Sequence, residues 1–164
     1  MMRTKFYYLL IIIVVMLDQL TKFFIAKNLS QYDSVTIIPG FFKLVHVRND
    51  GAIFGLLSDS GKSWVFFVLT VASLLALSLV VYYFHIVPAK DKVFKIALAL
   101  ILAGALGNLV DRVLRGYVVD FLHFYIKGWQ WPSFNIADSC ITIGALLLLY
   151  IFFIRKKETC IQSS

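Results

Sequence analysis

The sequence predicts an all-α polytopic membrane protein with four transmembrane helices and a small extracytoplasmic β-sheet. Of its 164 residues 60% are hydrophobic and 16% are aromatic, whereas soluble domains contain about 45–50% apolar residues. Four apolar segments are each long enough to cross a hydrocarbon layer of about 30 Å. They cover residues 6–26, 64–87, 93–110 and 136–154, and we expect residues 1–164 to form a single integral membrane domain.

The first apolar segment could belong either to a signal peptide or to a retained helix. Arg3 and Lys5 precede it, as basic residues precede the apolar core of a signal peptide. No small-x-small cleavage site follows, however, and the polar residues Asp18 and Lys22 stand there instead. Because residues 23–26 are apolar again, we predict a retained first transmembrane helix.

The distribution of Lys and Arg predicts that both termini are cytoplasmic. Positive charge is dense before the first span, between the second and third spans, and after the fourth. The connections 27–63 and 111–135 are longer and carry their positive charges thinly spread, so both should be extracytoplasmic. The excess of 16 Lys and Arg over 9 acidic residues then reflects topology, and we expect no nucleic-acid partner.

Both outer connections contain short elements of their own. Residues 34–38 and 41–48 are typical of strands joined by a turn, and residues 117–125 are rich in β-branched and aromatic side chains. Residues 52–57 are too short to span the membrane but apolar enough to lie on its surface. We therefore expect a small sheet and an interfacial segment to cover the outer ends of the helices.

Three of the predicted spans place polar side chains at one depth, near the outer interface. Asp18 lies about 18 Å beyond the start of the first span, in the outer half of the hydrocarbon layer. A charge costs about 2.5–3.5 kcal/mol at a helix centre and less near the interface, so this convergence indicates a site. The converging residues are Asp18, Lys22, Asn108, Asp111, Arg112, Asn135 and Asp138.

A strip on the third helix has two interpretations. Gly104, Gly107, Asn108, Asp111 and Arg112 share one side of that helix, because residues three and four apart are neighbours. Glycines let another backbone approach closely. The strip is therefore either a packing seam that ends in an Asp111–Arg112 ion pair or part of a polar site.

The acidic residues differ in how well structural roles explain them. Asp18 and Lys22 are four residues apart on one helix, which favours a structural ion pair. Asn135 and Asp138 fit an N-cap and its N3 partner, a variant of the capping box. Asp120 lies in an apolar strand and has no capping role. Alternation would place it on the strand face that points towards the membrane.

Two carboxylates that approach closely in a low-dielectric environment cannot both ionise. One pKa then rises, and the pair offers a general base that activates water and a general acid for a leaving amine. Sequence spacing alone does not bring Asp120 and Asp138 together, since they lie on different elements. No Cys or His cluster has the spacing of a metal site.

Five polar blocks follow one another along the chain. They are Asp18-Gln19-Leu20-Thr21-Lys22, Asn49-Asp50-Gly51-Ala52-Ile53-Phe54-Gly55, Gly104-Ala105-Leu106-Gly107-Asn108-Leu109-Val110-Asp111-Arg112, Val118-Val119-Asp120-Phe121 and Phe134-Asn135-Ile136-Ala137-Asp138-Ser139. With these blocks in this order, the chain resembles the lipoprotein signal peptidases (type II signal peptidases) over nearly its whole length. Ile53 departs from the family, which commonly has a small residue there.

The resemblance implies an aspartyl endopeptidase of the bacterial plasma membrane. It would cut the signal peptide from prolipoproteins before the lipobox cysteine, after that cysteine has received a diacylglyceryl group. Asp120 and Asp138 match the catalytic dyad, and no metal or cofactor is required. The implied partners are lipidated prolipoproteins and membrane phospholipid. The chain would act as a multi-pass monomer with its active site at the outer leaflet.

The resemblance also implies roles for residues around the dyad. Asn108 and Asn135 match positions that orient the dyad or bind substrate. Asp111 and Arg112 match positions with structural and substrate-contacting roles. The remaining matches to functional positions around the site are Asp18, Lys22, Asn49 and Gly51.

Three alternatives make different predictions. A small ion- or proton-coupled transporter should carry polar groups through the whole bilayer depth, but the second span contains no Asp, Glu, Lys or Arg. A membrane scaffold would use Gly104 and Gly107 as dimer contacts and would tolerate loss of both acids. Presenilin-type and prepilin-peptidase-type proteases carry a Gly-x-Gly-Asp pattern that this chain lacks.

Overall fold

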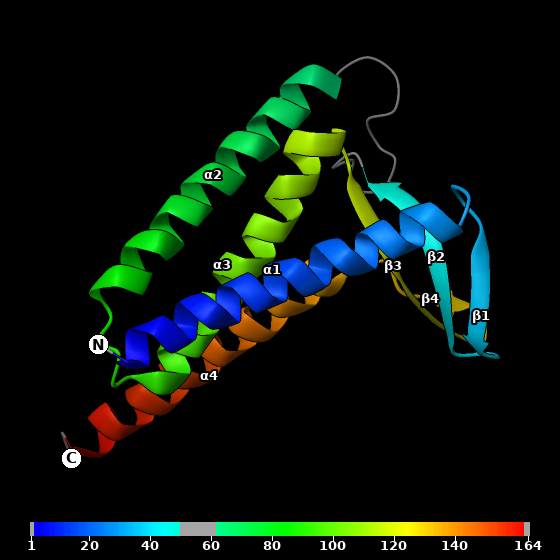
Figure 1. Ribbon diagram of the computed structural model, residues 1–164. Coiled ribbons are helices and arrows are strands. Elements are labelled where there is room, and N and C mark those ends of the chain that lie inside the picture. Colours follow the sequence, from blue (N-terminus) through cyan, green and yellow to red (C-terminus); the bar gives the residue numbers. More distant parts are fainter. Residues whose placement is uncertain (1, 50–61, 163–164) are drawn as a thin grey trace.

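The computed structural model describes residues 2–49 and 62–162, which form four helices and a small antiparallel sheet (Figure 1). The helices are α1 (Met2–Asn28), α2 (Lys62–Ile86), α3 (Lys92–Arg115) and α4 (Ile136–Gln162). The strands are β1 (Ser34–Ile38), β2 (Phe42–Asn49), β3 (Val118–Ile126) and β4 (Trp129–Gln130). The four predicted helices and the predicted β-structure in both long connections are confirmed. The expected interfacial segment 52–57 lies outside the described residues.

Three of the helices contain described stretches that are long and apolar enough to cross a membrane. These stretches are Thr4–Asn28, Lys92–Arg115 and Ile136–Phe153. In α2 the described apolar stretch is the shorter Leu74–Ile86. A fourth crossing by α2 therefore stays a prediction.

The third helix is longer than the apolar segment that predicts it. We expected the span to end at residue 110, but α3 continues to Arg115 and ends at Gly116. Gly116 has a φ of 78°, and its N–H donates to the carbonyl of Arg112 at 3.1 Å. Glycine enters this left-handed conformation without steric cost, which ends the helix and turns the chain into β3.

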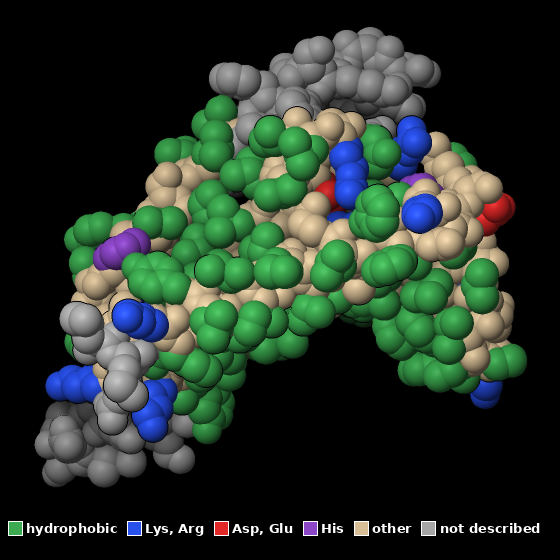
Figure 2. All heavy atoms as spheres, in the orientation of Figure 1, with side chains coloured by type: hydrophobic (Ala, Val, Ile, Leu, Met, Phe, Trp, Pro, Cys, Tyr) green, Lys and Arg blue, Asp and Glu red, His purple; other side chains and the backbone are tan. Residues whose placement is uncertain are grey.

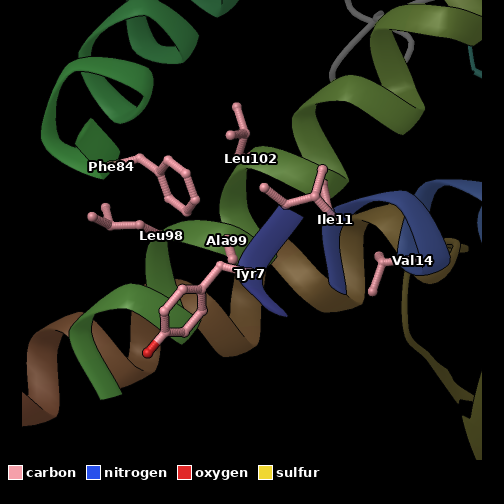
Figure 3. Close-up of a cluster of buried hydrophobic side chains, with 8 residues drawn as sticks. Tyr7, Ile11, Val14, Phe84, Leu98, Ala99 and Leu102 are labelled. Atoms are coloured by element: carbon pink, nitrogen blue, oxygen red, sulfur yellow. The ribbon is translucent and has the colours of Figure 1, made fainter. Parts of the chain in front are cut away.

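The described core is a cluster between α1, α2 and α3 (Figure 3). Tyr7 of α1 and Phe84 of α2 are 3% and 1% exposed, and they pack near Leu98 of α3. The Tyr7 hydroxyl also donates to the Ala89 carbonyl at 3.2 Å. Because lipid tails are as apolar as these side chains, the cluster stabilises the bundle through close packing rather than through exclusion of water. Its other buried members are Ile11, Val14, Ala99, Leu102 and Ala103.

Glycines set the distance between α3 and its neighbours. A Cβ on Gly104 would clash with the Ala137 carbonyl oxygen of α4. A Cβ on Gly144 of α4 would lie 2.7 Å from the Ala97 carbonyl oxygen of α3, so the two backbones almost touch. On Gly107 a Cβ would lie 2.7 Å from Oδ2 of Asp18 on α1. The two glycines of the predicted strip thus lie where α3 meets α4 and α1.

The sheet has the strand order β1-β2-β3-β4, with every neighbouring pair antiparallel. In the β2–β3 register Val47 faces Asp120 and Asn49 faces Val118. The sheet lies at one end of the helices, whereas both chain termini and the α2–α3 connection lie at the other (Figure 1). The sheet end is where the polar residues of three helices and two strands meet.

Candidate functional site

Polar side chains from α1, α3, β2, β3 and the start of α4 form one connected network at the sheet end of the helices. Asp18, Lys22, Asp111 and Asn135 are fully buried, and Asp120 is 2% exposed. Such groups tolerate burial only when they are hydrogen-bonded or paired. Each of these buried groups therefore needs partners within the network.

Asp120 is held on β3 by two amide groups. Its Oδ1 accepts from Nδ2 of Asn135 at 2.8 Å, and its Oδ2 accepts from Nδ2 of Asn49 at 2.9 Å. Residues Val118 to Phe121 are all buried, so β3 is covered on both faces and does not show the simple alternation that the sequence predicts. The carboxyl group of Asp120 is directed at the start of α4.

The pKa of Asp120 is raised to about 6, mainly by burial and in smaller part by the nearby charge of Asp138. The hydrogen bonds from Asn49 and Asn135 and the charge of Lys22 act in the opposite direction. A carboxyl group with this pKa keeps its proton to a higher pH than an ordinary aspartate does.

Asp138 is both a helix cap and a member of the site. Its N–H donates to Oδ1 of Asn135 at 2.9 Å, and its Oδ2 accepts from the Asn135 N–H at 3.3 Å. This is the reciprocal capping box that the sequence predicts. The other carboxyl oxygen, Oδ1, accepts from Nδ2 of Asn108 at 2.7 Å. Both oxygens of Asp138 are therefore oriented by asparagines.

Asn135 lies between the two acids. Its Nδ2 donates to Asp120, while its Oδ1 and its backbone N–H bind Asp138. The fold thus brings Asp120 and Asp138 to the same asparagine, although they lie on different elements. Two carboxyl groups held in this way, with one pKa raised, can share a proton and supply a base and an acid to one substrate.

Four charged side chains, Lys22 among them, form one connected group of ion pairs. The Nζ of Lys22 lies 2.8 Å from Asp18 Oδ2 and 2.9 Å from Asp111 Oδ2, and all three side chains are fully buried. Asp111 also pairs with Arg115 at 2.9 Å. The Asp18–Lys22 pair is the one that the i, i+4 spacing predicts.

The packing-seam interpretation ends in an Asp111–Arg112 ion pair, and that pairing is wrong. Asp111 pairs with Arg115, four residues on, because that residue lies on the same helix face whereas an adjacent residue points about 100° away. Arg112 instead approaches the Asn108 carbonyl at 3.5 Å. Arg115 was missed by sequence reasoning, although its spacing from Asp111 could have indicated the pair.

Two further contacts were not predicted. Gln19 donates through Nε2 to Asp18 Oδ2 at 3.2 Å and to the Gly107 carbonyl at 3.0 Å. The Ala137 N–H, in the first turn of α4, donates to Asp18 Oδ1 at 2.9 Å. A backbone donor carries no sequence signal of its own, so only the structure reveals this bond. Gly51, the remaining expected site residue, lies outside the described residues.

The histidines stay apart from the acids in the described contacts. His46 Nδ1 lies 2.8 Å from the Leu29 carbonyl oxygen, and His123 Nδ1 lies 2.9 Å from Ser133 Oγ. Within residues 2–49 and 62–162, no cluster of three His, Cys, Asp or Glu side chains is placed to hold a metal ion.

A cavity of about 310 Å³ opens beside Asp138. Its walls come from α2, α3 and α4, and its polar lining is formed by Asn108, Arg112 and Asp138. Most of its surface is apolar, so an extended apolar group could lie in it with its polar end at the carboxyl group. The apolar lining residues are Leu74, Ala76, Leu77, Val80, Ile101, Ala105, Leu109 and Ile141.

Comparisons with known proteins agree on one family. A family model described as "Signal peptidase (SPase) II" matches residues 10–154. The lipoprotein signal peptidase of Bacillus pumilus is 44% identical over 154 residues, which cover 94% of this chain and 96% of the relative. That of Syntrophus aciditrophicus is 42% identical over 146 residues, or 89% of this chain and 91% of the relative.

Two solved structures of bacterial membrane enzymes match the fold of this chain. A bacterial membrane enzyme determined by the in meso method at 1.9 Å superposes with a TM-score of 0.78 and 40% identity. The match covers 90% of this chain and 92% of that one. A second such structure, at 2.3 Å, also gives a TM-score of 0.78 and 40% identity, covering 94% and 91%.

Proposed function

The chain belongs to the signal peptidase II family, and on that premise we propose that it cleaves diacylglyceryl-modified prolipoproteins with an aspartyl dyad formed by Asp120 and Asp138. Family membership makes it a multi-pass membrane peptidase of lipoprotein processing. The observation that supports the dyad is Asn135, which binds both carboxyl groups at once. The transporter alternative has no support from the comparisons.

In the proposed reaction the two acids divide the proton transfers. One aspartate is ionised and removes a proton from water as the water oxygen attacks the scissile carbonyl carbon. The other is protonated and donates to the leaving nitrogen of the lipidated cysteine as the C–N bond breaks. The raised pKa of Asp120, about 6, supports its role as the acid, because it keeps its proton to a higher pH than an ordinary aspartate does. Asn108 and Asn135 hold the carboxyl oxygens in place.

The substrate is proposed to enter from the membrane. The cavity beside Asp138 has apolar walls that suit a signal helix or an acyl chain. Arg112 lies on its polar side, and Asn49 holds Asp120 from β2. Gly51 completes the proposed set of residues that bind substrate or support the dyad.

The remaining parts of the proposal concern the whole chain. Residues 1–164 form one monomeric domain of the bacterial plasma membrane, with both termini in the cytoplasm. Residues 27–63 and 111–135 lie outside, so the dyad faces the outer leaflet, where the lipidated cysteine of a prolipoprotein lies.

The test is cleavage of a purified lipidated prolipoprotein by Asp120→Asn and Asp138→Asn variants. We expect each variant to lose at least about 100-fold in kcat, because general acid–base catalysis contributes that much or more. Asp33→Asn is the matched control, since it makes the same chemical change at an exposed acid outside the network. The unlipidated precursor should not be cut. Activity retained by both dyad variants would overturn the assignment of the dyad.

A further inference from the structure

Lys22 uses all of its hydrogen-bonding capacity inside the protein. Its Nζ contacts Asp18 Oδ2 at 2.8 Å, Asp111 Oδ2 at 2.9 Å and Asn108 Oδ1 at 3.0 Å. An ammonium group has three N–H donors, so these three contacts leave none for a substrate. Lys22 is also fully buried. Its role must therefore be exerted through its three partners.

The first partner of Lys22 is Asp18, which also binds the residue before Asp138. Asp18 contacts Lys22 through Oδ2, and through Oδ1 it accepts the N–H of Ala137 at 2.9 Å. Ala137 directly precedes Asp138 in the first turn of α4. A fixed Ala137 amide therefore fixes the backbone from which the Asp138 side chain departs.

The second partner of Lys22 is Asp111, which also binds the residue before Asp120. Asp111 contacts Lys22 through Oδ2, and the same oxygen accepts the N–H of Val119 at 3.3 Å. Val119 directly precedes Asp120 on β3 and is fully buried. The same ammonium group thus connects the backbone positions that precede the two acids.

The third partner orients a side chain. Asn108 accepts from Lys22 through Oδ1 and donates through Nδ2 to Asp138 Oδ1 at 2.7 Å. Reversing this amide would place its NH₂ group against the ammonium group, which has no acceptor. Lys22 therefore selects the Asn108 orientation that binds Asp138.

On the basis of the proposed aspartyl mechanism, we infer that Lys22 is the positioning residue of the dyad. It ties α1 to α3 and, through Asp18 and Asp111, holds α4 and β3 at the residues that precede Asp138 and Asp120. A displacement of about 1 Å between reacting groups can cost about 100-fold in rate. A lysine that only balanced buried charge could be replaced by any neutral arrangement without this loss.

The test variant removes the contacts that Lys22 makes but leaves no buried charge without a partner of opposite charge. Lys22→Met alone would leave Asp18 buried without its cation, so it is combined with Asp18→Asn. Arg115 still balances Asp111 in the double variant, and the Asn side chain still offers an oxygen to the Ala137 N–H.

Lys95→Met is the matched control. Lys95 is another buried lysine, 3% exposed, at the opposite end of α3. It donates to the Phe84 carbonyl and lies 4.2 Å above the Phe84 ring. Its loss should lower the thermal midpoint of unfolding but leave kcat of the folded enzyme within about twofold of the wild type, because it does not contact the polar network.

Two measurements decide the inference. In the double variant, kcat per folded enzyme should fall about 10- to 100-fold with KM nearly unchanged. Amide hydrogen exchange at Ala137 and Val119 should accelerate at least about tenfold, since their acceptors are no longer held together. Unchanged kcat per folded enzyme, or an equal loss in Lys95→Met, would overturn the positioning role.

The exchange measurement also separates this inference from the proposed function. If the wild type cuts no lipidated precursor, the proposed function fails, whereas faster exchange at Ala137 and Val119 would still support the tie. If the double variant does not fold, hydrogen exchange in the wild type tests the inference instead. Its Ala137 amide should then exchange at least about tenfold more slowly than the amide of Val93, which lies in the first turn of α3. Equal rates would overturn the inference.

Discussion

At Asp120, burial and hydrogen bonding act on the pKa in opposite directions. Burial has the larger effect and raises the pKa from 3.8 to about 6, while the amides of Asn49 and Asn135 favour the ionised form. The folded state therefore binds more protons than the unfolded state between these two values. This contribution to stability is complete below pH 3.8 and is lost as the pH rises through about 6.

The same shift predicts the pH dependence of the peptidase. If the dyad works with one proton, kcat/KM should decrease as the pH rises through about 6, where Asp120 loses its proton. Asn49→Ala removes a donor that stabilises the ionised form, so it should move this alkaline limb to higher pH. Rate measurements between pH 4 and 9 on a lipidated substrate check this. A limb that moves to lower pH in Asn49→Ala would contradict it.

The sequence predicted which residues gather and the pairs within one segment, Asp18–Lys22 and Asn135–Asp138, but not the pairs between segments. Membrane depth alone placed Asp18, Lys22 and Asp111 near one another, because a buried charge needs a partner. It could not give the contact between Asn49 and Asp120. That contact depends on the register of β2 against β3, in which Val47 faces Asp120. Pairing between strands that lie far apart in the sequence is set by tertiary packing rather than by local pattern.

Among the elements, the helices were predicted best and their ends worst. Apolar length identifies a helix in a membrane, because every backbone polar group there must be satisfied within the segment. The polar last turns of α3 carry no such signal. They exist because Asp111 pairs with Arg115 and because Gly116 ends the helix. Both causes are local, and the i, i+4 spacing of the pair is the signal that would have extended the prediction.

The crossing of α3 and α4 predicts different effects for two glycine substitutions. Gly104→Ala places a methyl group against the Ala137 carbonyl and 2.7 Å from Cγ1 of Ile141, at the start of α4. Gly144→Ala, further along α4, places its methyl group 2.6 Å from Cγ1 of Ile101 on α3. Each should destabilise the protein by about 1–3 kcal/mol, since overpacking shifts the backbone.

Only Gly104→Ala should also lower kcat per folded enzyme, because Ala137 directly precedes Asp138 in the first turn of α4. Gly144→Ala is its control for the loss of stability. Thermal unfolding in detergent and cleavage assays on the folded fraction measure the two effects separately. Equal catalytic losses in both variants would contradict the idea that a shift of α4 at Ala137 specifically displaces Asp138.

At the scale of the whole molecule, polar groups are sorted towards opposite ends of the helices. The buried network lies at the sheet end, and on the face shown in Figure 2 exposed Lys and Arg side chains lie at both ends of the helices. Hydrophobic side chains cover most of the helix surface between these ends (Figure 2). Leu75, Phe152 and Phe153, for example, are 66%, 65% and 66% exposed. A surface of this kind matches a hydrocarbon layer.

The proposed topology, with both termini in the cytoplasm, predicts which side of the membrane each end of the helices faces. Lys90, in the α2–α3 connection, and Lys127, between β3 and β4, are both exposed and lie outside the polar network. In a background with Cys140→Ala and Cys160→Ala, Lys127→Cys should react with a membrane-impermeant maleimide in intact spheroplasts. Lys90→Cys should react only after permeabilisation. Labelling of Lys90→Cys alone in intact spheroplasts would reverse the orientation, and it would place the dyad on the side from which a lipidated precursor could not reach it.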